Sequence, residues 1–291
     1  MPLSVQLGLA LALATAVASL LGFLLKHRGA VESPDVEWRK PIRSSLRLFR
    51  SRAYALGMGV AMLSWGLHVA ALSLAPISLV QTVIAGGLVL LTVLANGVFG
   101  HHVTQREWIG VAMTAAGLAF LAATVGNTGD SAHADFEPAT LATYVGLLTI
   151  AGTAAAVAGW QTLTGASLVA AAAGLLWGAS DVSIKALSGT LDDNGIAVLV
   201  HPLAMVILLL SLYGLLVSTR SLQRGRAVPV IAITSAAANV VTIAAGPIVF
   251  GEPMPDGALG VTVRLAAFAL VVTAAALTPP PRTPEEATVA A

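Results

Sequence analysis

The chain contains no cysteine and few charged residues, since only 10% of its 291 residues are Asp, Glu, Lys or Arg. The absence of cysteine excludes disulfides, thiolate metal sites and cysteine nucleophiles. Hydrophobic residues make up 57% of the chain and its mean hydropathy is +0.87, which is far too apolar for a soluble domain of this size. The composition therefore predicts a polytopic membrane protein whose first partner is the lipid bilayer. A net charge of +1 gives no indication of a nucleic-acid partner.

The residue patterns of membrane enzymes are also missing. The sequence has no HExxH, no GxSxG and no paired aspartates within an apolar segment. We therefore expect no enzymatic activity and no cofactor. A membrane scaffold or receptor subunit that transports nothing remains an alternative, and it would be favoured if no cavity lies between the halves of the chain.

Nine segments are long and apolar enough, or nearly so, to cross the bilayer, which takes roughly 20 residues. They cover 5–25, 53–74, 76–99, 108–125, 138–158, 167–187, 196–218, 228–250 and 258–277. The fold class that we expect is an all-α polytopic membrane protein with nine transmembrane helices. We interpret the first segment as a retained helix, because its leader "MPLSVQ" lacks the positive charge of a signal peptide.

The distribution of positive charge predicts the orientation of these helices. The loop 26–52 holds eight of the fifteen Lys and Arg residues, which places it in the cytoplasm. By alternation five more cations fall on the same side, namely Arg106, Arg220, Arg224, Arg226 and Arg282. We therefore expect a plasma-membrane protein with its N-terminus outside and its C-terminus in the cytoplasm.

Within the basic loop, the segment "PIRSSLRLFRSR" alternates apolar residues at helical spacing with arginines. It predicts a short helix lying on the anionic inner leaflet, with a solvated loop as the equal alternative. The residues concerned are Ile42, Leu46 and Phe49 on one side and Arg43, Arg47 and Arg50 on the other.

Two similar segments indicate an internal repeat. "ANGVFGHHVTQREWIGV" closes the third apolar segment, and "AGPIVFGEPMPDGALGV" closes the eighth; both have Val-Phe-Gly followed at similar spacing by Gly-Val. We expect a 4+1+4 arrangement with inverted topology, as in many transporters. Residues 1–125 would form the first four-helix repeat, 126–162 a linking fifth helix, 163–277 the second, inverted four-helix repeat, and 278–291 a disordered cytoplasmic tail.

The sixth apolar segment carries two charges on an otherwise small-residue face. At helical spacing this face holds Ser167, Ala171, Gly174, Gly178, Asp181 and Lys185. The first segment has a similar face, formed by Gly8, Ala12, Thr15, Ser19, Gly22 and Lys26. Small residues allow another helix to approach closely, so both faces are expected to point into the bundle.

Asp181 and Lys185 stand four residues apart with the acid first, the spacing at which a helix allows an ion pair. Lys185 has a counterpart in Lys26, and its alternative role is a helix-end anchor that snorkels to the outer interface. Asp181 has none, because Gly22 occupies the equivalent position. An acid that the repeat does not require is the better candidate for a transport or coupling residue.

These segments resemble the drug/metabolite transporter superfamily (EamA-like), on the strength of "LAPISLVQTVIAGG", "VFGHHVTQREWIGVAMTAAGLAFL" and "GLLWGASDVSIKAL". The nine-segment layout, with "LGFLLKHRG" after the first helix, is most similar to its NIPA-type branch, which is linked to magnesium. The resemblance implies the inverted-repeat transporter fold. That superfamily usually has a glutamate after the third helix of each repeat; Glu252 matches it here, whereas the first repeat has His101.

Further polar residues in the apolar segments are candidates for transport or for bonds between helices. His68, Gln81, Asn96 and Asn239 belong to this set, and Trp177 with Trp65 could wall an apolar pocket. Arg264 lies near Glu252 and Asp256, so with Asp181 and Lys185 these charges are expected to converge on an outer vestibule.

Two substrate classes are possible, of which the sequence favours the first. One is a small solute, exported as a metabolite by a proton- or cation-coupled transporter with Asp181 as the coupling acid. The other is magnesium, for which Asp181 would be the metal ligand because Mg²⁺ prefers carboxylates and retained waters. The sequence leaves a homodimer open.

Overall fold

A computed structural model describes residues 2–34, 46–98, 133–160, 165–190, 200–225 and 227–277, with isolated positions between 105 and 120. Over 88–98 and at 227–229, 232, 272 and 275–277 it describes the backbone alone. The predictions that concern His101, Arg106, Arg226, Arg282, the fourth apolar segment beyond those positions and the tail lie outside the described residues.

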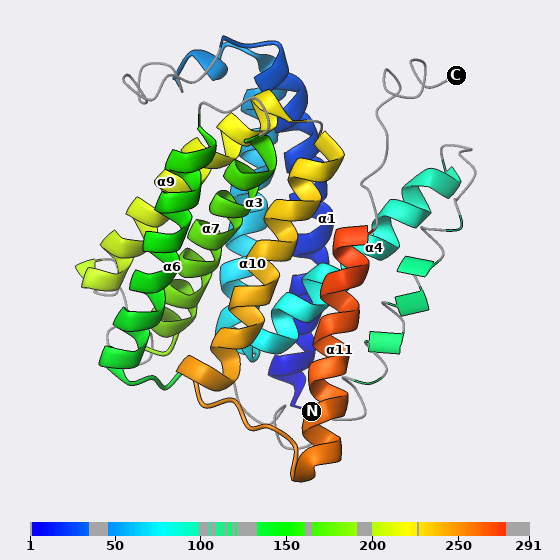
Figure 1. The fold of residues 1–291 in the computed structure, drawn as a ribbon, viewed down its shortest axis with the longest axis vertical. Coiled ribbons are helices and arrows are strands. Elements are labelled where there is room, and N and C mark those ends of the chain that lie inside the picture. The colour runs from blue at the N-terminus through cyan, green and yellow to red at the C-terminus, as the bar shows by residue number, and fades with distance from the viewer. Residues whose placement is uncertain are drawn as a thin grey trace.

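The described residues form eight α-helices and no strand (Figure 1). The helices are α1 (Leu3–Val31), α3 (Arg52–Leu74), α4 (Ile77–Val98), α6 (Pro138–Gly159), α7 (Ala166–Ser188), α9 (Pro202–Arg224), α10 (Ala227–Val249) and α11 (Gly257–Leu277). Five of them, α1, α3, α6, α7 and α9, are long and apolar enough to cross a membrane. The all-α class is as expected, and the chain is consistent with a polytopic membrane protein.

Helix starts follow local capping chemistry. Pro138 and Pro202 occupy the first turns of α6 and α9, where a missing backbone N–H costs nothing. The Nδ1 atom of His201 accepts a hydrogen bond from the backbone N–H of Leu203 at 3.2 Å, and the Ser51 hydroxyl accepts one from Tyr54 N at 3.4 Å. These caps satisfy backbone donors that have no partner inside their own helix.

Two predicted boundaries are wrong. The seventh segment, expected at 196–218, begins at Pro202 and continues to Arg224, so Arg220 and Arg224 lie in the last turns of α9 and not in a loop. The first helix continues past residue 25 to Val31, so Lys26 is a helix residue. Its side chain is buried. A hydropathy pattern predicts the end of a segment at the first charged residue, whereas a helix continues wherever its backbone hydrogen bonds and packing allow.

Contacts between helix ends define two ends of the bundle. At one end, the Gln223 amide of α9 donates to the backbone oxygens of Ala30 and Pro34, at 3.5 and 3.0 Å, beside the end of α1. We call this the Lys26 end. At the other, the Nζ atom of Lys185 in α7 bonds to the last carbonyls of α3, and we call it the Lys185 end. α1 and α7 therefore run in opposite directions, as do α3 and α9 (Figure 1).

The small-residue face of α7 packs on α10. A Cβ atom added to Gly174 would lie 2.4 Å from the backbone oxygen of Thr234, and one added to Gly178 would lie 2.3 Å from a methyl carbon of Val241. The equivalent face of α1 meets α3, where a Cβ on Gly8 would lie 2.9 Å from the Cβ of Ala75. The prediction that both faces point into the bundle is confirmed except at Ser167, near the start of α7, which is exposed.

Candidate functional site

Asp181 lies where α7 meets α3 and α4. The Nε2 atom of His68 on α3 is 3.2 Å from the Oδ1 atom of Asp181, and Gln81 on α4 donates from its amide nitrogen to the Oδ2 atom at 3.3 Å. His68 and Gln81 are themselves 3.4 Å apart. Two helices of the predicted first repeat, α3 and α4, therefore hold a carboxylate that lies in the predicted second repeat. We call His68, Gln81 and Asp181 the carboxylate site.

The carboxylate site is largely buried but not sealed. The side chain of Asp181 is 19% exposed and that of His68 is 9% exposed. On the far side of the imidazole, Nδ1 is buried and has no hydrogen-bond partner among the described residues. One edge of His68 therefore contacts Asp181, and the other has no partner among these residues.

The expected ion pair between Asp181 and Lys185 is not present among the described residues. Lys185 is fully buried, with 0% exposure, and donates from Nζ to the backbone oxygens of Leu72 and Ala75, at 2.7 and 2.9 Å. The snorkelling alternative is equally wrong, because the ammonium reaches no interface. The last carbonyls of a helix have no intrahelical donor and carry the negative end of its dipole, so they compete for the cation.

Glu252 contacts the corner at which α3 ends and α4 begins, where Lys185 also binds. Its carboxylate accepts hydrogen bonds from the backbone N–H of Ser78, at 3.4 Å, and from the Ser78 hydroxyl. Ser78 is in the first turn of α4, so an anion lies at the N-terminus of α4 and a cation at the C-terminus of α3. Both charges match the dipole of the helix end that they contact. We call Lys185, Glu252 and the α3–α4 corner the clasp.

The charged residues predicted to form one outer vestibule do not gather at a single site. Burial raises the pKa of Glu252 above its ordinary value of 4.5, while the bonds from Ser78 and the charge of Lys185 lower the pKa in opposition. Arg264 is 3% exposed and donates to the backbone oxygen of Pro253 at 2.7 Å, which holds the loop that carries Glu252. Asp256 is exposed. The five charges therefore separate into a carboxylate site, a clasp with Arg264, and one surface acid.

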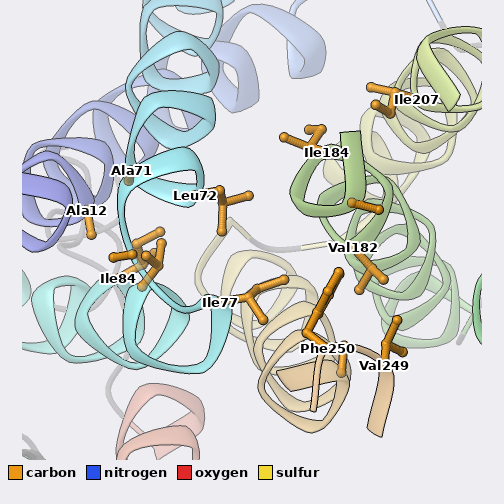
Figure 2. Close-up of a cluster of buried hydrophobic side chains, with 14 of the residues drawn as sticks. Ala12, Ala71, Leu72, Ile77, Ile84, Val182, Ile184, Ile207, Val249 and Phe250 are labelled. Carbon is orange, nitrogen blue, oxygen red and sulfur yellow. The ribbon is translucent and has the colours of Figure 1, made fainter. Parts of the chain in front are cut away.

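An apolar layer of buried side chains lies at the α3–α4 corner, beside the clasp. Figure 2 shows Leu72 and Ile77, which flank the α3–α4 corner, with Val182 of α7 and Phe250 beyond α10. Leu72, Ile77 and Val182 are completely buried. This layer and the clasp share the α3–α4 corner.

The remaining candidates lie elsewhere. The Trp177 ring packs on Phe23, with centroids 5.5 Å apart, and Lys26 lies 5.4 Å from its centroid, so it faces α1 and the Lys26 end. Trp65 is 46% exposed on the outside of α3. Asn239 is buried on α10, and Asn96 lies in α4 with its side chain outside the described part.

Sequence reasoning missed the partners that define these two groups. His68 and Gln81 were candidates, but no pattern linked them to Asp181, which is 100 or more positions further along the chain. Ser78 was not singled out, because a serine inside the first turn of a helix gives no sequence signal of an anionic partner. The carbonyls that bind Lys185 carry no side-chain signal at all.

Comparison with known proteins adds one informative likeness. Over 287 aligned residues the chain is 26% identical to the probable magnesium transporter NIPA9 of Arabidopsis thaliana, and the alignment covers 90% of this chain and 78% of that protein. No family model and no solved structure matches. The likeness and the apolar helices support the prediction of a membrane transporter.

Proposed function

We propose that this chain transports Mg²⁺ across a membrane and that Asp181 is the residue that binds it. The observation that carries the proposal is a partly exposed carboxylate inside the bundle, held by His68 and Gln81 from two other helices. A charge in such a place costs roughly 2.5–3.5 kcal/mol on insertion scales, so it marks a functional position. The likeness to a probable magnesium transporter over nine-tenths of the chain supports the substrate.

The donor set suits a partly hydrated Mg²⁺. This ion usually keeps several waters and binds through one or two carboxylates. Asp181 supplies a carboxylate, and rotation of the Gln81 amide would supply a second oxygen. The described residues hold no cluster of three or more His, Cys, Asp or Glu side chains that could form a complete protein cage. Cation and His68 would compete for Asp181, so the ion can leave when His68 re-forms its contact.

The fold proposed for this activity is the inverted repeat of the drug/metabolite transporter superfamily, with 1–125 and 163–277 as its halves. The antiparallel relation of α1 to α7 and of α3 to α9 supports it, as does the packing of α1 on α3 and of α7 on α9. In this scheme the carboxylate site lies between the halves. The clasp and the apolar layer then form a gate on the outer side, and passage requires them to separate.

A second candidate is proton-coupled export of a small organic solute. The observation in its favour is the contact between His68 and Asp181, two titratable groups within 3.2 Å. In this candidate Asp181 is the coupling acid and His68 is its contact partner. The apolar surroundings of the site would then suit a partly apolar solute.

Transport by purified protein in liposomes separates these candidates. The vesicles contain a Mg²⁺-sensitive dye, and the magnesium gradient and the proton gradient are imposed independently. We expect a magnesium gradient alone to drive flux, and Asp181→Asn to abolish it while expression stays near normal, because the amide keeps the shape but removes the charge. Flux of Mg²⁺ at the wild-type rate in Asp181→Asn would contradict the assignment.

Asp135→Asn provides the matched control, since it makes the same chemical change at an exposed acid outside the site. His68→Gln distinguishes the mechanisms further. It should leave magnesium-driven flux measurable in the first candidate and remove proton coupling in the second.

A further inference from the structure

A basic cavity opens at the Lys26 end, far from the carboxylate site. Its volume is about 650 Å³, within the range of small-ligand sites. The end of α1, the turn at 46–50 and the start of α3 line it. Four of its lining residues are arginines and one is a glutamate, which gives the lining a net charge of +3: Arg28, Arg47, Arg50, Arg52 and Glu32.

Most of this charge is not neutralised within the protein. Arg28 pairs with Glu32, with 3.6 Å between Nε and Oε1. Arg47, Arg50 and Arg52 have no carboxylate partner in the part of the chain that the structure describes. Three guanidinium groups around one opening favour an anion, and arginine matches the oxygens of a phosphate better than lysine does.

The turn that carries Arg47 and Arg50 is held in place. Leu48, between them, is 1% exposed and belongs to the buried core. The Phe49 ring meets Tyr54 edge-on, with centroids 5.5 Å apart, and Ser51 N donates to the backbone oxygen of Leu48 at 3.0 Å. The arginines therefore project from a fixed support.

An apolar strip leads from the cavity along the outside of the bundle. Leu25 and Leu56 line the cavity beside the arginines. One helical turn from Leu25 toward the start of α1 lies Leu21, which is 52% exposed. Two turns from Leu56 toward the end of α3 lies Leu63, which is 61% exposed. The site thus combines a basic end with an apolar strip on helices that are apolar enough to span a membrane.

We propose that this cavity binds the phosphate headgroup of an anionic phospholipid, whose acyl chains lie along the strip between α1 and α3. The Lys26 end is the one that the charge distribution predicts to be cytoplasmic, where anionic lipids concentrate. The proposal is independent of the transported substrate and of Asp181. A soluble phosphate shares the headgroup chemistry but makes no use of the apolar strip.

Native mass spectrometry of the full-length protein in neutral detergent tests this. Phosphatidylglycerol is titrated against phosphatidylcholine of the same acyl chains. We expect the first phosphatidylglycerol to bind roughly tenfold or more tightly than phosphatidylcholine, and the double variant Arg47→Gln/Arg50→Gln to lose that preference. Arg224→Gln is the matched control, because it removes an exposed arginine at the same end but outside the cavity. It should keep the preference.

Arg47→Lys/Arg50→Lys guards against a folding artefact, and it should bind phosphatidylglycerol more tightly than the double glutamine variant. Equal affinity for the two lipids in the wild-type protein, or an unchanged preference in Arg47→Gln/Arg50→Gln, would overturn the proposal. In a final competition experiment, inorganic phosphate is added to the complex with phosphatidylglycerol. If it displaces phosphatidylglycerol at a concentration equal to that of the lipid, the cavity is a site for a soluble anion and the lipid assignment is wrong.

Discussion

Asp181 and Lys185 show how two charges on one helix face acquire different partners. They are one turn apart on α7, yet Asp181 contacts His68 and Gln81, while Lys185 contacts the end of α3. Each charge is stabilised by partners on other helices, which lowers the cost of placing it inside the bundle. Of the two, Asp181 alone keeps some exposure, which is why we propose it for transport and propose a structural role for Lys185.

Glu252 gives a prediction at the same scale. Since burial raises the pKa of this carboxyl above 4.5, the folded protein binds its proton more tightly than the unfolded chain does. Its contribution to the free energy of unfolding is therefore complete below pH 4.5 and is lost as the pH rises through the folded-state pKa. We expect Glu252→Gln to flatten this fall in stability, measured as the melting temperature across a pH series.

Glu137→Gln is the control for that series, because Glu137 is exposed at the start of α6 and its replacement should leave the slope unchanged. A variant Glu252→Gln with the same pH slope as the wild type would show that the carboxyl is not held as described.

At the scale of elements, the clasp joins the α3–α4 corner to α7 and to the loop before α11. Lys185 makes two charge-assisted bonds with the last carbonyls of α3, and a hydrogen bond to a charged group contributes about 1.5–3 kcal/mol. Lys185→Gln should therefore lower the free energy of unfolding by about 2 kcal/mol, measured by denaturant titration in detergent. Lys185→Met keeps the apolar stem without the donors, and wild-type stability in that variant would show that the bonds give no net stabilisation.

The contact between α7 and α10 depends on glycine. At Gly174 an added Cβ would lie 2.4 Å from the Thr234 backbone oxygen, which cannot move without its helix. Gly174→Ala should therefore force the two helices apart and cost about 1–3 kcal/mol, as overpacking does. Thermal unfolding in detergent measures the loss.

Gly146 on α6 is the matched control, because nothing lies within 4 Å of its added Cβ. Gly146→Ala should raise stability by about 0.5–1 kcal/mol, since alanine is the better helix former. Equal effects at the two positions would mean that close packing at Gly174 is not what holds α7 to α10.

For the whole molecule, the orientation in the membrane is the main prediction. The lack of native cysteine allows single cysteines to be placed at will. Asp135→Cys and Asp256→Cys, exposed at the Lys185 end, should react with an impermeant thiol reagent from outside intact cells, whereas Glu32→Cys at the Lys26 end should not. The opposite labelling pattern would reverse the orientation and place the basic cavity on the outer leaflet.

Much of the helical layout was predictable from hydropathy alone. The sixth segment was expected at 167–187 and α7 is Ala166–Ser188; the second and eighth agree with α3 and α10 to within one residue. Apolar runs this long leave few alternatives in a bilayer, because every backbone polar group needs a partner within its own helix. The exceptions, α1 and α9, continue through cationic residues that hydropathy treats as breaks.

The sequence by itself determined the membrane class, most of the helix positions and the small-residue faces, and it singled out Asp181 as a candidate. Those features depend on composition and on a 3.6-residue period, both of which are local. Only the tertiary structure decided that His68 and Gln81 hold Asp181, that Lys185 binds carbonyls and not Asp181, and that Glu252 is buried at Ser78. Each of these contacts joins residues more than ten positions apart, and several use backbone oxygens, which every residue has and no sequence pattern marks.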